Sequence, residues 1–294
     1  VVLHADCNVV AGLKACGTKE TTEAVGSSIE FGKGLCKAGT AHDECGLVTV
    51  CCEMCTWDHP AERSRRYRFS MNSARFAKLM ASDSDSLDLD EVSLIMSGVL
   101  QPGLDEIEWL AALELLAAEC QTPTPEGISR YLFGELGFSG NRGAYYDWRN
   151  SCLDRVIATR TGIPISLSIL MIEVGRRLGV ELQGVGMPAH FLVKAADNDG
   201  VFFDPFDGGR QLDRRQAREL FETITRGQAP WSESHLDPTP NRAIVIRMLN
   251  NLKAVFARRS DEVRFALVMQ LRSQVPELAV LEADEFDSAN AIFN

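Results

Sequence analysis

The chain has 294 residues, of which 45% are hydrophobic, and a formal net charge of −11. This length and apolar content predict a globular protein with one sizeable domain or two small ones. The acidic balance disfavours a phosphate-binding surface, so we expect no nucleic-acid partner. No apolar run approaches the about 20 residues that cross a bilayer, so we expect no membrane association. No secretion signal opens the chain, which favours a cytoplasmic location.

Residues 1–70 differ from the rest because they hold most of the nine cysteines and show no sustained hydrophobic period. We expect a disordered leader, or upstream sequence read through from a misplaced start, with the protein beginning near Met71. A disulfide-linked segment is disfavoured without a secretion signal. A zinc knuckle remains an alternative, and its ligands would be Cys52 and Cys55 of a CxxC pair, Cys45, and either His42 or Cys36.

Helical patterns dominate the next part of the chain. Apolar residues at helical spacing behind acidic first turns predict helices over 87–100 and 102–120. The QTPTPEG segment reads as a loop that leads into a third helix over 128–138. After the turn SGNRG, a fourth helix is predicted over 149–160. These helices form a lead-in to the apolar segment that follows.

The segment 163–174 is apolar almost all round, which predicts a helix buried in the core. Pro164 suits its first turn, where the missing N–H is not needed. At about 100° per residue, Ser166, Glu173 and Arg177 fall on one narrow polar stripe. In the simpler interpretation Ser166 fills a tight turn and Glu173 pairs with Arg177. In the other, Ser166 faces a site at the positive end of the helix.

After Gly179 the pattern changes to short strands over 182–186, 190–194 and 201–206. A hairpin folded about Asp197 would place His190, at the start of one strand, near Asp204, at the end of the next. Asp204 would then orient the imidazole of His190, as a carboxylate orients a catalytic base. Alternatively, His190 is a structural residue that caps a strand, and Asp204 holds the turn before Pro205.

The last third of the chain returns to helices, predicted over 213–225, 241–259 and 261–274. The last two suit a helical hairpin, which must dock on the core or on a partner because it cannot bury its own apolar side. We therefore expect a main domain over 71–238 and a C-terminal hairpin with an acidic, frayed tail over 239–294.

Residues 137–194, which run from GFSGNRGAYYDWRNS through TGIPISLS to PAHFLVK, and the following FFDPFDGG resemble the bacterial SirB-type family of the transglutaminase-like superfamily. The resemblance covers roughly residues 78–272. It implies an α+β fold of the cysteine-protease or transglutaminase-like type, with a central helix on a small antiparallel sheet. It also implies leading helices and a trailing tetratricopeptide-like hairpin.

The resemblance implies a nucleophile at the N-terminus of the central helix, with His and Asp on adjacent strands. His190 and Asp204 match the histidine and the aspartate of the superfamily. The cysteine has no counterpart in the GIPISLS turn, where the SirB-type family also commonly lacks it. Ser166 is the nearest candidate nucleophile, and Cys152 is a less favoured one because it reads as a small buried hydrophobe. Trp148 stands where the family commonly has proline.

From these features we expect a cytoplasmic, regulatory module that binds a protein or peptide through a degenerate site without the thiol. The alternative is an amide or ester hydrolase or an acyl-transfer enzyme, with Ser166 or Cys152 as nucleophile, His190 as base and Asp204 as orienting residue. A serine hydroxyl is far less acidic than a thiol, so it would need full general-base help and an oxyanion hole. We expect no cofactor and no metal, and the oligomeric state is left open.

Overall fold

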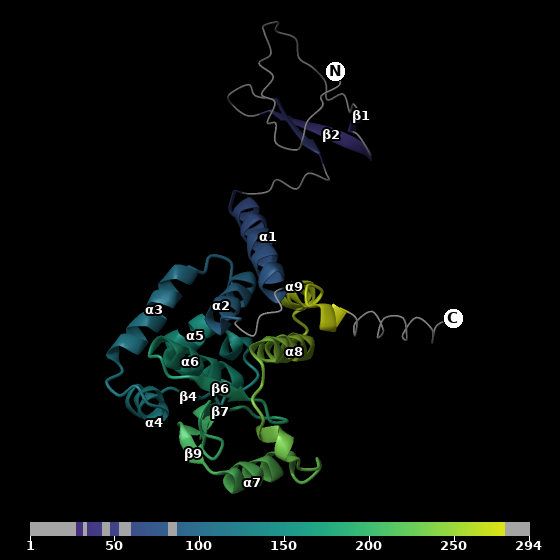
Figure 1. Cartoon of the computed structure of the whole chain (residues 1–294). Helices are drawn as coiled ribbons and strands as arrows, with labels where there is room; N and C mark the ends of the chain where they lie inside the picture. The colour runs from purple at the N-terminus through teal and green to yellow at the C-terminus, as the bar shows by residue number, and fades with distance from the viewer. Residues whose placement is uncertain (1–27, 32–33, 43–47, 53–59, 82–86, 280–294) are drawn as a thin grey trace, which may run out of the picture. The chain divides into compact units, whose positions relative to one another are not determined.

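The computed structural model describes residues 28–31, 34–42, 48–52, 60–81 and 87–279, with side chains from Met71 onward (Figure 1). The chain divides into two compact units, Val1–Ser64 and Arg65–Asn294.

In the first unit, three strands form an antiparallel sheet: β1 (Ser28–Phe31), β2 (Gly34–His42) and β3 (Val48–Cys52). The expectation of a disordered leader, or of upstream sequence read through from a misplaced start, stays a prediction. The side chains of the proposed zinc ligands lie outside the described residues. Both the zinc site and a start near Met71 therefore stay predictions.

The lead-in helices begin with α1 (Pro60–Ala81), which runs through the domain boundary predicted at residue 70 because no Gly or Pro interrupts it. Next come α2 (Leu89–Leu100) and α3 (Glu106–Glu119), which correspond to the predicted helices. The third predicted helix starts earlier than expected, as α4 (Pro125–Ser129), and continues as the π-helical η1 (Arg130–Glu135). Thr124 Oγ1 accepts the N–H of Gly127 at 3.1 Å, so part of the supposed QTPTPEG loop is a capped helix start.

The predicted fourth helix is divided into a 3₁₀ turn, η2 (Trp148–Ser151), and α5 (Leu153–Thr159). The break falls at Cys152, whose backbone is extended (φ −99°, ψ 118°). Two short parallel strands, β4 (Ser139–Gly140) and β5 (Thr161–Gly162), lead to α6 (Pro164–Arg177).

Helix α6 is the central helix of the second unit. Twelve of its fourteen residues are buried, as the nearly uniform apolar pattern predicts. It contacts α2, α3 and α5 of the lead-in and also the strands β6 (Leu182–Val185) and β7 (Leu192–Ala195) of the sheet. Burying each large aliphatic side chain contributes about 1.5–3 kcal/mol, so this helix holds both layers together.

The sheet has the order β6-β7-β8-β9 and is antiparallel throughout. Its strands are β6 (Leu182–Val185), β7 (Leu192–Ala195), β8 (Phe202–Asp204) and β9 (Arg210–Leu212). Strand β9 was not predicted, because three residues are too short for a period of two to be recognised. The combination of this sheet with the helices confirms the expected α+β class.

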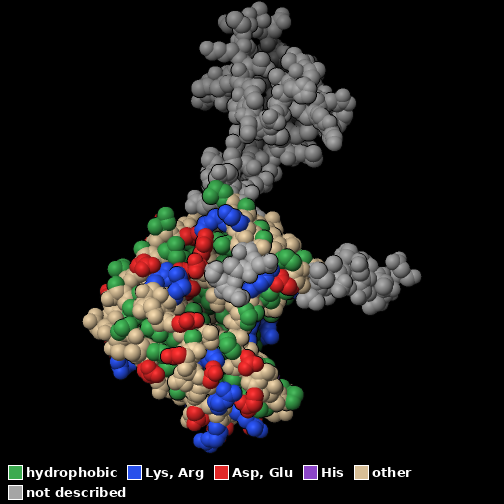
Figure 2. Space-filling view, in the orientation of Figure 1, with side chains coloured by type: hydrophobic (Ala, Val, Ile, Leu, Met, Phe, Trp, Pro, Cys, Tyr) green, Lys and Arg blue, Asp and Glu red, His purple; other side chains and the backbone are tan. Residues whose placement is uncertain are grey.

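The C-terminal part contains α7 (Arg214–Thr225), the 3₁₀ turn η4 (Glu233–Leu236), α8 (Asn241–Arg259) and α9 (Glu262–Arg272). The apolar face of α8 joins the same hydrophobic cluster as α2 and α6, so this hairpin docks on the core. Basic and acidic side chains are interspersed around α7, at the bottom of Figure 2, where Arg215–Glu219 and Arg218–Glu222 are ion pairs. The likeness to a tetratricopeptide repeat stays a prediction.

Among the described helices, none combines the length and the apolar character of a membrane span.

Candidate functional site

His190 and Asp204 form a buried, hydrogen-bonded pair. His190 Nε2 lies 3.0 Å from Asp204 Oδ2, and the side chains are only 7% and 2% exposed. The other carboxylate oxygen, Oδ1, accepts the backbone N–H groups of Phe206 at 3.1 Å and Asp207 at 3.3 Å. These bonds cap the 3₁₀ turn η3 (Pro205–Asp207). Asp204 therefore does both things that the sequence left as alternatives, because it orients the imidazole and holds the turn.

The second ring nitrogen of His190, Nδ1, has no hydrogen-bond partner within the described part of the chain. Since Nε2 is engaged by Asp204, Nδ1 is the nitrogen that remains to bind a ligand. In a neutral imidazole one nitrogen donates and the other accepts, and the carboxylate favours the proton on Nε2. Nδ1 is then an acceptor, and it becomes a donor when the ring is protonated.

The hairpin that carries this pair is shifted from the predicted register. The pairs Val193–Phe203 and Lys194–Phe202 centre the turn on Asn198 instead of Asp197. Strand β7 starts at Leu192, so the prediction that His190 opens the strand is wrong. The loop between β6 and β7 therefore extends past His190, and an alternating pattern of apolar residues does not show where such a loop ends.

His190 instead ends a tight turn, in which its N–H donates to the carbonyl of Met187 at 3.2 Å. The residue before it, Ala189, has a φ of 61°. A positive φ is what the third position of a type II turn requires, and Gly or Asn usually occupies that position. The backbone that presents His190 is therefore strained.

Ser166 lies in the first turn of α6 and is 1% exposed. Its Oγ donates to the carbonyl of Asn150 at 2.6 Å, with the carbonyl and the N–H of Ile163 each 3.1 Å away. A hydroxyl has one proton, and the shortest contact assigns it to Asn150. Within the described chain Ser166 makes no hydrogen bond with His190, so the structure does not join these two predicted site residues by a hydrogen bond.

Cys152, the other candidate nucleophile, is 1% exposed, and its Sγ lies 3.8 Å from the carbonyl of Trp148. Burial, reinforced by the negative charge of Asp154, raises the pKa of this thiol far above its usual range. The thiolate is the reactive form of cysteine, so these surroundings disfavour nucleophilic attack. Cys152 also makes no described contact with His190. The catalytic roles of all four residues stay predictions.

An aromatic side chain that sequence reasoning did not single out, Phe206, packs against the His190 ring and links it to Tyr145. Phe206 packs edge-on against His190, with ring centroids 6.1 Å apart, and edge-on against Tyr145, at 5.8 Å. Tyr145 and its neighbour Tyr146 are 38% and 52% exposed. The signal in the sequence is the YYDW run, whose two adjacent tyrosines lie outside any periodic apolar pattern.

Arg247, on α8, reaches the backbone on which His190 is mounted. Its Nη2 donates to the carbonyls of Met187 and His190, each at 2.7 Å. The guanidinium lies 5.5 Å from the centroid of the Phe191 ring. Sequence reasoning missed this residue because it is 57 positions from His190 and no local pattern links them.

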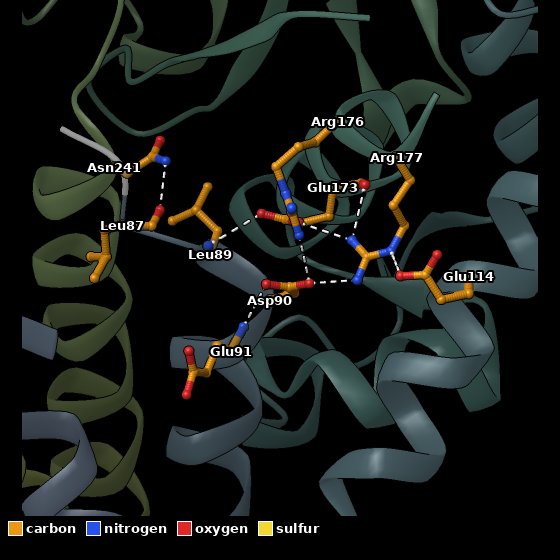
Figure 3. Close-up of polar contacts among 9 residues, drawn as sticks. All are labelled: Leu87, Leu89, Asp90, Glu91, Glu114, Glu173, Arg176, Arg177 and Asn241. Atoms are coloured by element: carbon orange, nitrogen blue, oxygen red, sulfur yellow. Dashed lines mark hydrogen bonds and ion pairs between the residues drawn. The ribbon is translucent and has the colours of Figure 1, made fainter. Parts of the chain in front are cut away.

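A second group of charges joins α6 to the lead-in helices, and we call it the ionic cluster: Asp90, Glu114, Glu173, Arg176 and Arg177. Figure 3 shows the Arg177 guanidinium between three carboxylates, at 2.6 Å from Asp90, 2.8 Å from Glu114 and 3.0 Å from Glu173. The last contact confirms the ion pair expected on the polar stripe of this helix.

Glu173 is the most central carboxylate of the ionic cluster. It also accepts the N–H of Leu89, at the start of α2, at 3.2 Å, and Arg176 Nε at 2.8 Å. Burial and then the charge of Asp90 raise the pKa of Glu173, against the opposing effect of Arg176 and Arg177. These contacts give the cluster a structural role, because every charge in it faces an opposite one.

Among the described side chains, no three His, Cys, Asp or Glu residues gather closely enough to hold a metal ion. The expectation that the protein works without a cofactor stays a prediction.

Residues 102–250 match a family model described as the transglutaminase-like superfamily. A UPF0162 protein of Xylella fastidiosa is 38% identical over 192 residues, which cover 61% of this chain and 68% of that protein. Protein SirB1 of Salmonella typhimurium is 25% identical over 191 residues, covering 63% and 68%. F-box only protein 21 of Mus musculus is 35% identical over 115 residues, covering 36% and 18%.

No solved structure matches the chain. The matched region contains α6, the His190–Asp204 pair and Arg247. Both the family model and the similarity to UPF0162 and SirB1 proteins show that this chain belongs to the transglutaminase-like superfamily, in its SirB-type family.

Proposed function

We propose that this protein is a cytoplasmic regulatory module that binds a protein or peptide at the surface around His190, without acyl-transfer chemistry. The observation that carries the proposal is the 2.6 Å hydrogen bond from Ser166 Oγ to the carbonyl of Asn150. Because this bond directs the Ser166 proton away from His190, it supports a His190–Asp204 pair that binds a ligand and does not activate a nucleophile.

The alternative, a hydrolase or acyl-transfer enzyme, requires the nucleophile to give its proton to the base during attack. Ser166 would first have to break its bond to Asn150 and then become accessible from a buried position, since only 1% of it is exposed. Cys152 would have to ionise although burial raises the pKa of its thiol. Within the described chain the hydrogen bonds that Ser166 and Cys152 donate go to backbone carbonyls and not to His190, which supports the binding function over the enzyme.

Positive support for binding comes from Tyr145 and Tyr146. They are among the few large hydrophobic side chains that stay exposed on the described surface, and Arg258 stacks 4.1 Å above the ring of Tyr146. Tyrosine and arginine are enriched at protein interfaces, where they bury apolar area and keep a polar tip for hydrogen bonding. Together with His190 Nδ1, they offer both an apolar anchor and a polar contact.

The test combines a binding measurement with an activity measurement on the full chain. A photo-crosslinking amino acid at position 146 is expected to give a discrete crosslinked partner in cells. The same amino acid at Leu115, which is 62% exposed on α3, serves as the matched control and should not. Purified protein is expected to leave p-nitrophenyl acetate unhydrolysed above background.

Turnover of that ester, lost in Ser166→Ala or Cys152→Ala and in His190→Ala, would establish the enzyme instead. Identical crosslinking from positions 146 and 115 would remove the binding surface from the neighbourhood of His190.

A further inference from the structure

Arg247 is a half-buried guanidinium with no carboxylate at ion-pair distance in the part of the chain that the structure describes. Arg177, in the ionic cluster, is the opposite case, because three carboxylates surround it. Burial lowers the pKa of Arg247, yet a guanidinium remains charged at neutral pH. A charge removed from water without a counter-ion is costly. Binding of an anion next to Arg247 would offset this cost.

The Arg247 guanidinium is held in place by hydrogen bonds, but some of its N–H donors have no partner in the described chain. Nη2 makes both hydrogen bonds, to the carbonyls of Met187 and His190, whereas Nη1 and Nε have no partner among the described residues. Gly186 makes room for it, since a Cβ there would lie 3.1 Å from Arg247 Nη1 and 2.9 Å from Thr239 Oγ1. The arginine is thus oriented in advance, with donors left for a ligand.

The groups beside Arg247 that lack partners are also suited to an anion. Arg247 Nη2 donates to the His190 carbonyl at 2.7 Å, and the centroid of the Phe206 ring lies 6.1 Å from that of His190 and 5.8 Å from that of Tyr145. In agreement with this chain of contacts, the positive charge of Arg247 opposes the rise in the pKa of Tyr145 that burial and then Tyr146 cause. The Tyr145 hydroxyl makes no hydrogen bond within the described chain. Phe206 contacts both Tyr145 and His190. We call these four residues the Arg247 site: Tyr145, His190, Phe206 and Arg247.

The charge of the site selects the anion. Arg247 contributes one positive charge without a carboxylate partner in the described chain. Arg142, whose guanidinium lies 4.9 Å from the centroid of the Phe206 ring, is already paired with Asp207 at 2.7 Å. The negative charge of Asp204 is already used by His190 and by two backbone N–H groups. One carboxylate balances one guanidinium and can accept two of its N–H groups in parallel. A dianionic phosphate would leave a negative charge uncompensated in a half-buried place.

We propose that the Arg247 site recognises a carboxylate of the bound peptide, either an Asp or Glu side chain or the C-terminal carboxylate. The inference rests on the proposed binding function and names the chemical group that the partner must present. Arg247 pairs with the carboxylate, the Tyr145 hydroxyl donates to it, and Phe206 covers it from one side.

The experiment is an NMR titration of the full chain that follows the His190 ring signals, with four probes. N-acetylphenylalanine carries a terminal carboxylate, and N-acetylphenylalanine amide is its neutral match. N-acetylaspartate N-methylamide carries a side-chain carboxylate, and inorganic phosphate is the competing anion. We expect at least one carboxylate to shift the His190 signals with saturation and the amide to leave them unchanged. Whichever carboxylate binds tighter identifies the source.

Arg247→Gln is expected to weaken carboxylate binding about ten- to a hundredfold, because a charged hydrogen-bonded contact is lost. Arg218→Gln, on the exposed face of α7, is the matched control and should leave binding unchanged. If Arg247→Gln does not fold, Tyr145→Phe removes only a hydroxyl and is expected to weaken binding about two- to tenfold.

Equal affinity for the carboxylate and the amide, unchanged binding in both variants, or tighter binding of phosphate would each overturn the carboxylate site. Crosslinking from position 146 that persists in Arg247→Gln would show that the binding function stands while this inference fails. Loss of crosslinking in the wild type would remove the binding function itself.

Discussion

Arg177 and Arg247 are both withdrawn from solvent, and their surroundings differ in a way that separates stability from function. Arg177 sits among Asp90, Glu114 and Glu173 (Figure 3). Arg247 is bonded to two backbone carbonyls and, within the described chain, to no carboxylate. A charge that is fully paired internally holds helices together. A guanidinium without a carboxylate partner, next to an oriented histidine, is instead available to a ligand.

The largest expected effect is on the paired side of this comparison. Glu173→Ala removes the carboxylate that accepts from Arg176, Arg177 and the N–H of Leu89. We expect the free energy of unfolding to fall by about 3–5 kcal/mol, because breaking a buried pair leaves uncompensated charge. Urea unfolding of the full chain measures this fall.

The control for that variant is Glu219→Ala, which breaks the exposed pair with Arg215 on α7 and should cost less than about 1 kcal/mol. Equal losses in the two variants would mean that the ionic cluster is not what anchors α6.

The next prediction concerns Arg247, the arginine without a carboxylate partner. Gly186→Ala places a methyl group 3.1 Å from Arg247 Nη1 and 2.9 Å from Thr239 Oγ1. We expect a loss of about 1–3 kcal/mol from overpacking, together with weaker carboxylate binding as the guanidinium shifts. Thermal unfolding and the probe titration give the two readouts.

The control is Gly143→Ala, where a Cβ meets nothing within 4 Å. It should change the free energy of unfolding by less than about 0.5 kcal/mol. Unchanged binding in Gly186→Ala would show that Arg247 needs no room at this glycine.

The ionic cluster also predicts a pH dependence. Burial and Asp90 raise the pKa of Glu173 above its ordinary 4.5. As the pH rises through 4.5, the unfolded chain releases this proton and the folded chain keeps it. The contribution of Glu173 to stability is therefore full below that pH and declines as the pH rises toward the raised folded-state pKa.

Glu173→Gln carries no titrating proton and removes this decline. Urea midpoints of the wild type and of Glu173→Gln are measured from pH 4 to pH 7. The stability of the wild type relative to the variant should fall as the pH rises. A wild type that gains stability relative to the variant over this range would mean that the arginines outweigh burial.

The smallest expected effect is at the turn that presents His190. Ala189 has a φ of 61°, and left-handed backbone costs an L residue roughly 1–2 kcal/mol. Glycine removes that cost but loses about 0.5–1 kcal/mol through its freedom in the unfolded chain. Ala189→Gly should therefore stabilise the protein by up to about 1 kcal/mol in denaturant unfolding. Ala196→Gly, at a residue without positive φ, should destabilise it, and equal effects at the two positions would contradict strain at Ala189.

Hydrophobic periodicity was sufficient for the long helices. The patterns over 102–120, 163–174, 213–225 and 241–259 each correspond to a helix in the structure, because such elements repeat the same contact many times. Short elements were less predictable. The break at Cys152 and the three-residue strand β9 each depend on a few backbone angles or pairs, which leave no repeating signal.

For the site, the sequence by itself determined that a histidine and an aspartate would meet on a hairpin following a buried helix, since chain neighbours fold into adjacent strands. Only the tertiary structure decided that the Ser166 proton goes to Asn150, that His190 stands in a turn before its strand, and that Arg247 reaches the same place from α8. These contacts join residues from separate elements, and a one-dimensional pattern does not contain the distances between elements that only packing establishes.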